Sequence, residues 1–247
     1  MLKLRLIPVL TYNGFALVKT KSFGKNPRMV GNPIQAARVF NSRKVDELVF
    51  TDIFATRQSR KLNLNIVEKV INECFMPVSI GGNVSTLEDI NDLLKIGADK
   101  VVINSNAFHD SFINKAADKF GESTIILSVD ILIESKKKFI LLSGKKYPFE
   151  NYIDKIKNYN YGELFLTSVN NEGTQQGFDI DLFNFFYESV DKPIIFNGGA
   201  GNLNHFYDLF SNTKIEAVAS SSIFYFTQYN PDDIKKEIKK IRNNVRL

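Results

Sequence analysis

Cysteine and histidine are scarce in this chain of 247 residues, which contains one cysteine and two histidines. Cys74 has no partner for an intrachain disulfide and lies in an amphipathic run, so we expect a buried structural thiol without a catalytic role. His109 and His205 fall at expected helix starts, and no group of His, Cys and Asp residues has the spacing of metal ligands. The sequence therefore predicts no metal site and no cofactor.

The chain also lacks long apolar runs and linker-like segments. At most two apolar residues follow one another before Pro8, which is too short for the roughly 7–15-residue apolar region of a signal peptide or the about 20 residues of a spanning helix. No Pro-, Gly- or Ser-rich stretch and no block of charge interrupts the sequence. We expect residues 1–247 to form one ordered domain in the cytoplasm, without membrane contact.

Sequence motifs of several common enzyme classes are absent. No Gly-x-Ser-x-Gly elbow, Walker loop or G-x-G-x-x-G after a strand occurs, which excludes the usual hydrolases, nucleotidases and dinucleotide-binding proteins. The net charge of +5 at pH 7 is spread along the chain, with local density only at residues 136–138 and 235–242. A charge of this kind favours anionic small molecules as ligands and does not indicate a nucleic-acid surface.

Short apolar runs rich in β-formers alternate with helical patterns along the whole chain. This alternation is typical of βαβ units and a parallel sheet, and about 250 residues is the usual length of a single (β/α)8 barrel. We therefore predict an α/β fold of the TIM (β/α)8-barrel type. The predicted strands are residues 4–10, 47–52, 78–81, 100–104, 124–130, 163–168, 194–197 and 217–220.

Helix starts and one hairpin can be placed between these strands. The expected N-caps are Asn32 before Pro33, Ser85 in a capping box with Glu88, and Asn230 before Pro231. Residues 139–142 and the turn at Ser143 and Gly144 follow the fifth strand and predict a small inserted hairpin. Insertions after the strands of a barrel lie at its functional face.

The two halves of the chain resemble each other. Residues 47–53 parallel 163–169, residues 77–82 parallel 193–199, and residues 106–108 parallel 222–224, with an offset of 116 residues for the first and third pairs. Solenoid repeats have periods of roughly 20–50 residues, so this longer spacing indicates two similar half-barrels. The duplication predicts two equivalent phosphate sites.

Glycine pairs follow the third and seventh predicted strands, where the backbone can approach a ligand without a Cβ in the way. Small polar residues follow one strand later in each half. A turn without a ligand explains either glycine pair alone, but two symmetric sets favour phosphate binding, which barrels often place in the loops after strands 7 and 8. The predicted phosphate-binding residues are Gly81, Gly82, Asn104, Ser105, Gly173, Thr174, Gly198, Gly199, Ser221 and Ser222.

Candidate acid–base residues lie at strand ends. Asp130 closes the fifth strand and Asp52 the second, so each carboxylate either points into the barrel mouth or caps the following loop. Partial burial at the mouth would raise the pKa of Asp130 toward a value useful in catalysis. Lys19 follows the first strand and its loop, where it can meet a substrate anion.

Charged residues occupy the opposite rim of the predicted barrel. Arg5, Glu47, Lys100 and Glu163 stand at the beginnings of strands 1, 2, 4 and 6. Charges at the N-terminal rim of a barrel more often stabilise the fold than act in catalysis. We expect them to form an interlocking ring that closes the bottom of the barrel.

Four stretches of the chain carry a family resemblance: residues 46–53, 97–104, 166–168 with 172–174, and 198–201. By these stretches, and over residues 4–247, the chain resembles the cyclase subunit of imidazole glycerol phosphate synthase. In that family a glutaminase subunit docks at the N-terminal barrel face as a heterodimer partner, and ammonia passes through the barrel to a phosphorylated substrate at the mouth. The resemblance implies an ammonia gate at Arg5, Glu47, Lys100 and Glu163, a partner contact at Asp99, catalysis by Asp130, and phosphate binding by the residues given above.

The first strand departs from the family pattern. The family has Ile-Pro-Cys-Leu-Asp where this chain has Ile-Pro-Val-Leu-Thr at residues 7–11, so Thr11 replaces a second catalytic aspartate. A hydroxyl cannot act as a carboxylate base near neutral pH, and losing one member of an acid–base pair commonly costs about 10²–10⁴-fold in rate. Asn83, Asn170 and Glu172 also differ from the family's usual residues.

Three functions fit these residues. The first is an ammonia-dependent lyase or cyclase of histidine biosynthesis. The second is an altered paralogue that conducts ammonia to a third protein, which amidates a sugar of a surface polysaccharide such as lipopolysaccharide. The third is a sugar-phosphate isomerase of the related barrel family. The gate argues against the isomerase, Thr11 argues against efficient cyclisation, and the resemblance over the full length keeps the cyclase as the principal hypothesis.

Overall fold

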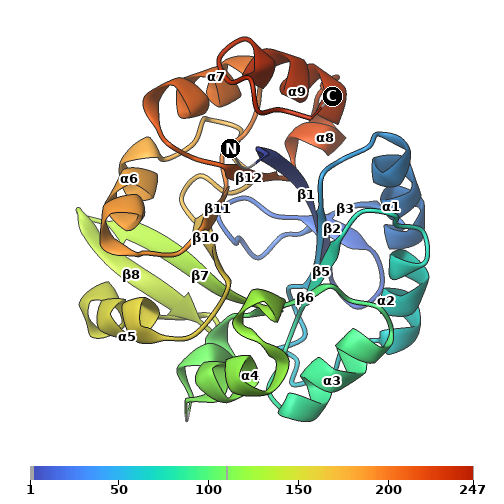
Figure 1. The fold of residues 1–247 in the computed structure, drawn as a ribbon, viewed down its shortest axis with the longest axis vertical. Coiled ribbons are helices and arrows are strands. Elements are labelled where there is room, and N and C mark those ends of the chain that lie inside the picture. The colour runs from blue at the N-terminus through green and yellow to red at the C-terminus, as the bar shows by residue number, and fades with distance from the viewer. Residues whose placement is uncertain (1–2, 110, 247) are drawn as a thin grey trace.

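The parallel strands close into a barrel in the computed structural model, which describes residues 3–109 and 111–246 (Figure 1). Within these residues eight parallel strands follow one another around the sheet, and the sheet closes because β12 pairs with β1. The predicted (β/α)8 barrel is therefore confirmed, whereas Met1, Leu2, Asp110 and Leu247 of the predicted domain lie outside the described residues. The barrel strands are, in order, β1 (Arg5–Tyr12), β4 (Leu48–Asp52), β5 (Val78–Gly81), β6 (Lys100–Ile103), β7 (Ile125–Glu134), β10 (Glu163–Ser168), β11 (Ile194–Asn197) and β12 (Ala217–Ser220).

Helices form an outer layer around this sheet (Figure 1). None of the helices within the described residues is both long and apolar enough to cross a membrane. The α-helices are α1 (Pro33–Ser42), α2 (Leu64–Ile71), α3 (Leu87–Lys95), α4 (Phe112–Phe120), α5 (Ile153–Asn158), α6 (Ile180–Ser189), α7 (Leu203–Asn212), α8 (Ile223–Phe226) and α9 (Pro231–Lys239). Short 3-10 helices occupy η1 (Ser105–Phe108), η2 (Glu122–Thr124) and η3 (Phe149–Asn151).

Polar caps begin several of these helices. Asn32 and Asn230 accept backbone hydrogen bonds at the starts of α1 and α9, as predicted. The expected cap at Ser85 is wrong by one residue, because Thr86 accepts from the N–H of Asp89 and Asp89 accepts in return from the N–H of Thr86. Aspartate thus fills the position that a capping box usually gives to Glu or Gln, and α3 begins one residue later than expected.

Two hairpins extend the sheet beyond the carboxyl ends of the barrel strands. The one after β7 was predicted, and its first strand begins two residues earlier than expected. The one after β1 was not predicted, because its second strand is exposed and lacks an alternating apolar pattern. The first hairpin contains β2 (Leu17–Lys19) and β3 (Arg28–Gly31), and the second contains β8 (Lys137–Leu142) and β9 (Lys145–Pro148).

The interior of the barrel is layered along its axis. Successive residues of a strand point to opposite faces of the sheet, so Arg5, Val9 and Thr11 of β1 lie on the same, inner face at increasing height. Charged side chains therefore lie at the amino ends of the strands, apolar side chains in the middle and polar side chains at the carboxyl ends. The apolar layer consists of Ile7, Val9, Val49, Val102, Ile126, Phe165, Ile195, Ala217 and Ala219.

The sequence repeat maps onto this closed sheet in a regular way. Segments that match in the sequence lie along β4 and β10, along β5 and β11, and directly after β6 and β12. In the order of the barrel strands the members of each pair are four positions apart. Equivalent residues such as Glu47 and Glu163 therefore approach the barrel axis from opposite sides.

Candidate functional site

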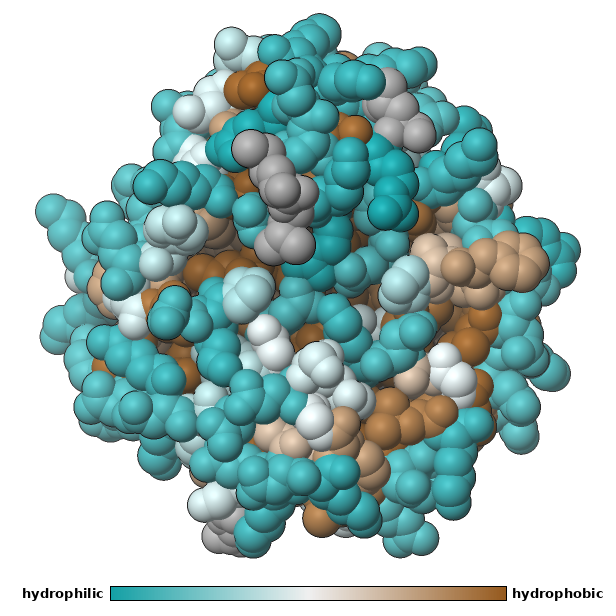
Figure 2. All heavy atoms as spheres, viewed as in Figure 1, coloured by the Kyte–Doolittle hydropathy of each residue, from teal (hydrophilic) through white to brown (hydrophobic). Residues whose placement is uncertain are grey.

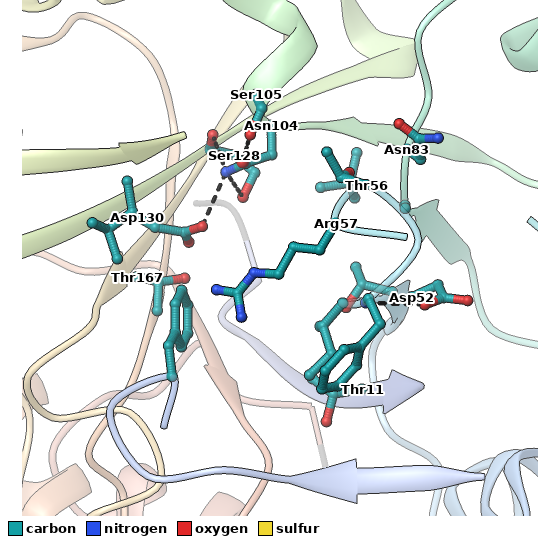
Figure 3. A pocket seen from close by; sticks show the side chains of 18 of the residues that line it. Thr11, Asp52, Thr56, Arg57, Asn83, Asn104, Ser105, Ser128, Asp130 and Thr167 are labelled. Atoms are coloured by element: carbon teal, nitrogen blue, oxygen red, sulfur yellow. Dashed lines mark hydrogen bonds between the residues drawn. The ribbon is translucent and has the colours of Figure 1, made fainter. Parts of the chain in front are cut away.

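A pocket of about 200 Å³ opens at the carboxyl ends of the barrel strands (Figure 3). Its floor is the apolar layer. Its walls are the inner side chains that lie two residues further toward the carboxyl end of each strand. The turn of the β8–β9 hairpin and the loop after β4 complete its rim. The polar wall residues on the inner face near the strand ends are Thr11, Thr51, Asn104, Ser128, Asp130, Thr167 and Asn197.

Asp130 is the half-buried carboxyl group on the wall of the pocket. Burial raises the pKa of Asp130 to about 7, although hydrogen bonds from Thr167 and Asn104 oppose the shift and the charge of Glu172 adds to it. Asn104 donates from Nδ2 to Asp130 Oδ2 over 3.1 Å. A group with a pKa near the working pH can both accept and release a proton, which is what acid–base catalysis requires.

A chain of hydrogen bonds connects the inserted hairpin to Asp130. The Ser143 N–H donates to Ser105 Oγ over 2.7 Å, and Ser105 Oγ donates to Asn104 Oδ1 over 2.9 Å. The other end of the Asn104 amide donates to the Asp130 carboxyl group, as the dashed lines in Figure 3 show. The hairpin turn therefore fixes the orientation of the acid–base candidate.

Lys19 and Thr11 form a hydrogen bond with each other at the opposite side of the pocket. Lys19 is 4% exposed, and its ammonium group donates to Thr11 Oγ1 over 2.9 Å, to Val9 O over 3.2 Å and to Ser221 Oγ. Burial lowers the pKa of Lys19 to about 8, and the charge of Glu172 opposes this shift. The Thr11 hydroxyl already donates to Val18 O, so it has no proton to give to a substrate.

Glu172 supplies a second carboxyl group to the pocket, on the loop after β10. Burial raises the pKa of Glu172, while the charge of Lys19 and a hydrogen bond from Asn197 act against the shift. Asn197 Nδ2 lies 3.3 Å from Glu172 Oε2. In the sequence Glu172 stood out only as a departure from the family, because nothing there shows that its side chain turns into the mouth.

The two sets of predicted phosphate-binding residues lie in different surroundings. Gly81, Gly82, Asn104 and Ser105 of the first half line the pocket. Residues 173, 174, 198, 199, 221 and 222 are not among the described residues that line it. Gly199 has a φ of +110°, and a Cβ there would lie 1.9 Å from Gly177 O, so this glycine is needed for close packing of two loops.

The serines of the second half have distinct roles. Ser221 Oγ donates to Val9 O and accepts from Lys19. The buried Ser222 Oγ has no hydrogen-bond partner in the described part of the chain, which is the condition of a polar atom that awaits a ligand. Thr174 Oγ1 donates to Asn171 O over 2.8 Å. Phosphate binding by either set stays a prediction.

Asp52 lines the pocket, but its carboxylate is bound within the loop after β4. Its side chain is 0% exposed, and its two oxygens accept from Arg60 over 2.5 and 2.7 Å. The N–H groups of Phe54 and Ala55 also donate to Asp52, each over 3.1 Å. Of the two strand-end carboxylates that the sequence indicated, Asp130 is the one without an ion-pair partner among the described residues.

A ring of charges closes the amino ends of the strands, as expected. Arg5 Nη1 lies 2.8 Å from Glu47 Oε1, Arg5 Nη2 pairs with Glu163, and Lys100 also pairs with Glu163. Burial raises the pKa of Glu163, but the hydrogen bonds and charges of Arg5 and Lys100 outweigh it, so the net shift is downward. The Glu163 carboxylate is therefore ionised at neutral pH.

Other nucleophilic or metal-binding groups do not gather at this site. Cys74 is partly buried in the turn after α2, and burial together with the charge of Glu73 raises the pKa of its thiol to about 12. Such a thiol is a poor nucleophile near neutral pH. Over residues 3–109 and 111–246, no three His, Cys, Asp or Glu residues are grouped so that they could hold a metal ion.

The fold and this site define a (β/α)8-barrel protein with a polar pocket at one end of the barrel and a ring of paired charges at the other. The chain belongs to the histidine biosynthesis protein family, whose model matches residues 5–230. It is 37% identical over 253 residues to the imidazole glycerol phosphate synthase subunit HisF of Staphylococcus carnosus, with 100% of this chain and 99% of the relative covered.

Other relatives have a related name. The chain is 38% identical over 251 residues to a Campylobacter jejuni protein named "Putative imidazole glycerol phosphate synthase subunit hisF2", and 100% of both chains is covered. It is 37% identical over 237 residues to a Pseudomonas aeruginosa protein of the same name, with 92% of each chain covered. Relatives named HisF and relatives named hisF2 are thus similar to this chain to nearly the same degree.

Proposed function

We propose that this chain is a cyclase-type subunit of imidazole glycerol phosphate synthase, which uses ammonia from a glutaminase partner on a phosphorylated substrate in the mouth pocket. One arrangement carries the proposal: Asp130 in the pocket and the ring of Arg5, Glu47, Lys100 and Glu163 lie at opposite ends of one barrel interior. The names of the HisF relatives support the same reaction.

The barrel interior suits a neutral molecule such as ammonia. Transfer of an ion from water into an apolar layer costs far more free energy than transfer of a small neutral molecule. Lys100 pairs with Glu163, and within the described residues it forms no ion pair with Glu47, so the ring is less tightly paired on that side. A movement of Lys100 would break one ion pair of the ring and leave both pairs of Arg5 in place.

The mouth pocket supplies the groups that the reaction needs. Asp130 would transfer the proton at the reacting atoms, because its pKa of about 7 leaves both forms populated near neutral pH. The backbone at Gly81 and Gly82 would hold one phosphoryl group of the substrate. The buried and unpartnered Ser222 Oγ supports a second anion site on the other half of the barrel.

A glutaminase would dock on the face that carries the ring. Asp99 is exposed there, immediately before β6. Phe75 lies in the loop before β5, on the same face, and is 95% exposed. Most of the surface seen in Figure 2 is hydrophilic, with scattered apolar patches, so an aromatic ring this exposed is a natural anchor for a partner protein.

The reaction can be tested directly with the histidine-pathway substrate. The chain is assayed with ammonium salts, and then with a co-expressed candidate glutaminase and glutamine. We expect turnover in both assays and its loss in Asp130→Asn. Asp118→Asn, an exposed carboxylate on the outer helix α4, is the matched control and should keep the rate. Turnover that survives in Asp130→Asn would refute the proposed acid–base role.

The contact between Thr11 and Lys19 favours a second candidate function. If the missing strand-1 carboxylate abolishes cyclisation, the chain would instead conduct ammonia to a third protein that amidates a sugar. The expected pattern is then a chain that activates its glutaminase partner but does not consume the histidine-pathway substrate. The sugar-phosphate isomerase hypothesis gains no support from the charge ring, because an isomerase admits no ammonia.

A further inference from the structure

Asn197 ends β11 with a buried acceptor atom that is not used by the protein. The residue is 6% exposed and lines the mouth pocket. Its Oδ1 atom has no hydrogen-bond partner among the residues that the structure describes. A buried acceptor without a donor costs free energy, so nearly all such atoms in native proteins have a partner. Asn197 Oδ1 is therefore available to an N–H or O–H donor of a small ligand in the pocket.

The other end of the Asn197 amide fixes the orientation of this acceptor. Asn197 Nδ2 lies 3.3 Å from Glu172 Oε2 and 3.4 Å from Thr167 Oγ1. An amide nitrogen only donates and an amide oxygen only accepts, so these two oxygen atoms hold the nitrogen on their side. The amide oxygen is thereby left on the side that faces no protein donor.

The Glu172 carboxyl group beside this amide also has acceptor capacity to spare. Asn197 donates to it, whereas the Lys19 ammonium acts on it by charge and without an ion pair. The Glu172 backbone is held from two sides, because its N–H donates to Ser168 O over 2.9 Å and its carbonyl accepts from the Ser22 N–H over 2.8 Å. Asn197 Oδ1 and the Glu172 carboxyl group thus form a preorganised acceptor corner of the pocket.

The acceptor corner lies directly above the apolar layer of the barrel. Ile195 belongs to that layer, and Asn197 is the next residue of β11 on the inner face. A neutral molecule that crosses the layer from the charge ring therefore meets Asn197 as it reaches the mouth. Every hydrogen of ammonia is an N–H donor, which suits a corner whose unused groups are acceptors.

Thr167 connects the acceptor corner to Asp130. Its hydroxyl accepts from Asn197 Nδ2 and donates to the Asp130 carboxyl group, and Figure 3 shows the two side chains next to each other. Burial and, to a smaller extent, the charge of Glu172 raise the pKa of Asp130. A molecule bound at the acceptor corner is therefore only one side chain away from the group that transfers protons in the proposed function.

We propose that the acceptor corner binds the ammonia that leaves the barrel interior and holds it near Asp130. This inference rests on the proposed function, in which ammonia crosses the barrel to a phosphorylated substrate. Its N–H groups donate to Asn197 Oδ1 and to the Glu172 carboxylate, and its lone pair stays free for the reaction. A hydroxyl group of the substrate is the competing donor for the same acceptor, and the affinities for ammonia and for the substrate separate the two.

The test is steady-state turnover of the histidine-pathway substrate by the full chain, with free ammonia and the substrate varied in turn. Asp130 is ionised at about pH 8.5, above its pKa of about 7, so the assay at that pH does not depend on small changes in this pKa. Asn197→Leu removes the acceptor at similar size. We expect its KM for ammonia to rise about 10-fold, with kcat at saturating ammonia and the KM for the substrate within about 2-fold of the wild type.

Two further variants complete the experiment. Glu172→Gln keeps an oxygen for Asn197 Nδ2 but removes the charge, and it should raise the KM for ammonia by about 3-fold. Asn212→Leu is the matched control, because Asn212 is exposed at the end of α7 and its side chain donates to Asp208 O over 2.8 Å. This variant should behave as the wild type. Thermal unfolding checks the folding of each variant, and if Asn197→Leu does not fold, Glu172→Gln decides the question.

Each other outcome has a definite meaning. An unchanged KM for ammonia in Asn197→Leu and Glu172→Gln would overturn the inference and leave the proposed function intact. A rise in the KM for the substrate alone would also overturn it, and would assign the Asn197 acceptor to a hydroxyl group of the substrate. Absence of turnover in the wild type at every concentration of ammonia would overturn the proposed function, and the inference would fall with it.

Discussion

Lys19 donates a hydrogen bond from its buried ammonium group to the hydroxyl of Thr11, with Nζ and Oγ1 2.9 Å apart. Val9 O and Ser221 Oγ accept the other hydrogen bonds of this group. The cation is thus fully hydrogen-bonded, but no carboxylate of the described residues forms an ion pair with it. Burial consequently lowers the pKa of Lys19 to about 8, against the opposing charge of Glu172. Thr11 occupies the place where a carboxylate would form an ion pair.

Thr11→Asp should therefore increase cyclisation of the histidine-pathway substrate. The new carboxylate would accept from the Lys19 ammonium group already aimed at this position, which would keep it ionised and would raise the pKa of Lys19. We expect an increase of roughly 10-fold or more, since a positioned acid–base group commonly contributes about 10²–10⁴-fold. The measurement is the rate of turnover at saturating ammonia. Thr11→Asn is the uncharged control of similar size, and equal rates for the Asp and Asn variants would refute the need for a carboxylate.

The pH dependence of turnover should report Asp130. Acting as a base, Asp130 must be ionised, so the rate at a fixed concentration of free ammonia should rise with pH through about 7. Asn104→Leu removes a hydrogen bond that lowers the pKa of Asp130, so this rise should move to higher pH. Arg57→Gln removes a favourable charge and should move it in the same direction. A profile that does not shift in either variant would assign the titration to another group.

The same pKa shift predicts a change of stability with pH. The pKa of Asp130 in the folded chain, about 7, lies above the value of about 3.9 in an unfolded chain. Folding therefore favours the protonated carboxyl group, and this stabilisation is complete below about pH 4 and is lost as the pH rises through about 7. Asp130→Asn does not titrate. As the pH rises from 4 to 7, the free energy of unfolding of the Asp130→Asn variant should therefore fall less than that of the wild type. Urea unfolding at several pH values measures this difference.

Association with a glutaminase should depend on Phe75. This side chain is 95% exposed on the face that carries the charge ring, and burial of an aromatic anchor typically contributes about 2 kcal/mol or more to binding. Phe75→Ser should thus weaken association by about 30-fold, measured by calorimetry with the partner. Phe15, 82% exposed in the turn after β1 at the opposite end of the barrel, gives the control. Equal effects of Phe15→Ser and Phe75→Ser would contradict docking on the N-terminal face.

The sequence predicted the barrel and both of its ends because these features follow from strand periodicity. A side chain two residues along a strand returns to the same face, so Arg5, Val9 and Thr11 had to share the barrel interior. The ring and the position of Asp130 follow in the same way. The hairpin after β7 was recognisable from its apolar run and its Ser143–Gly144 turn, since both are local signals.

Features that depend on loop conformation were not predictable. The rotamers of Arg57 and Arg60 decide which of the two arginines pairs with Asp52 and which one enters the pocket, and both residues belong to the same polar loop. The burial of Lys19 depends on the unpredicted β2–β3 hairpin, which returns the chain to β1. The direction of the Glu172 side chain depends likewise on tertiary packing of the loop after β10 and not on its own sequence.

The ion pair between Asp52 and Arg60 should contribute strongly to stability. In Arg60→Ala the Asp52 carboxylate would stay buried with its two backbone N–H contacts but without a counter-ion. Loss of one partner of a buried pair costs about 3–5 kcal/mol, and the Arg60 side chain is 28% exposed, so we expect a loss near the lower end of this range. Urea unfolding measures it.

Two further variants decide how this stability arises. Arg60→Ala combined with Asp52→Asn should lose less than the two single changes together, because the double variant leaves no unpaired charge in the loop. Arg38→Ala, which breaks an exposed pair with Glu73 on the outer surface, should have no measurable effect. If Arg60→Ala were as harmless as Arg38→Ala, the backbone N–H groups of Phe54 and Ala55 would be sufficient to hold the Asp52 carboxylate, and the loop that carries Arg57 would not depend on Arg60 for its position.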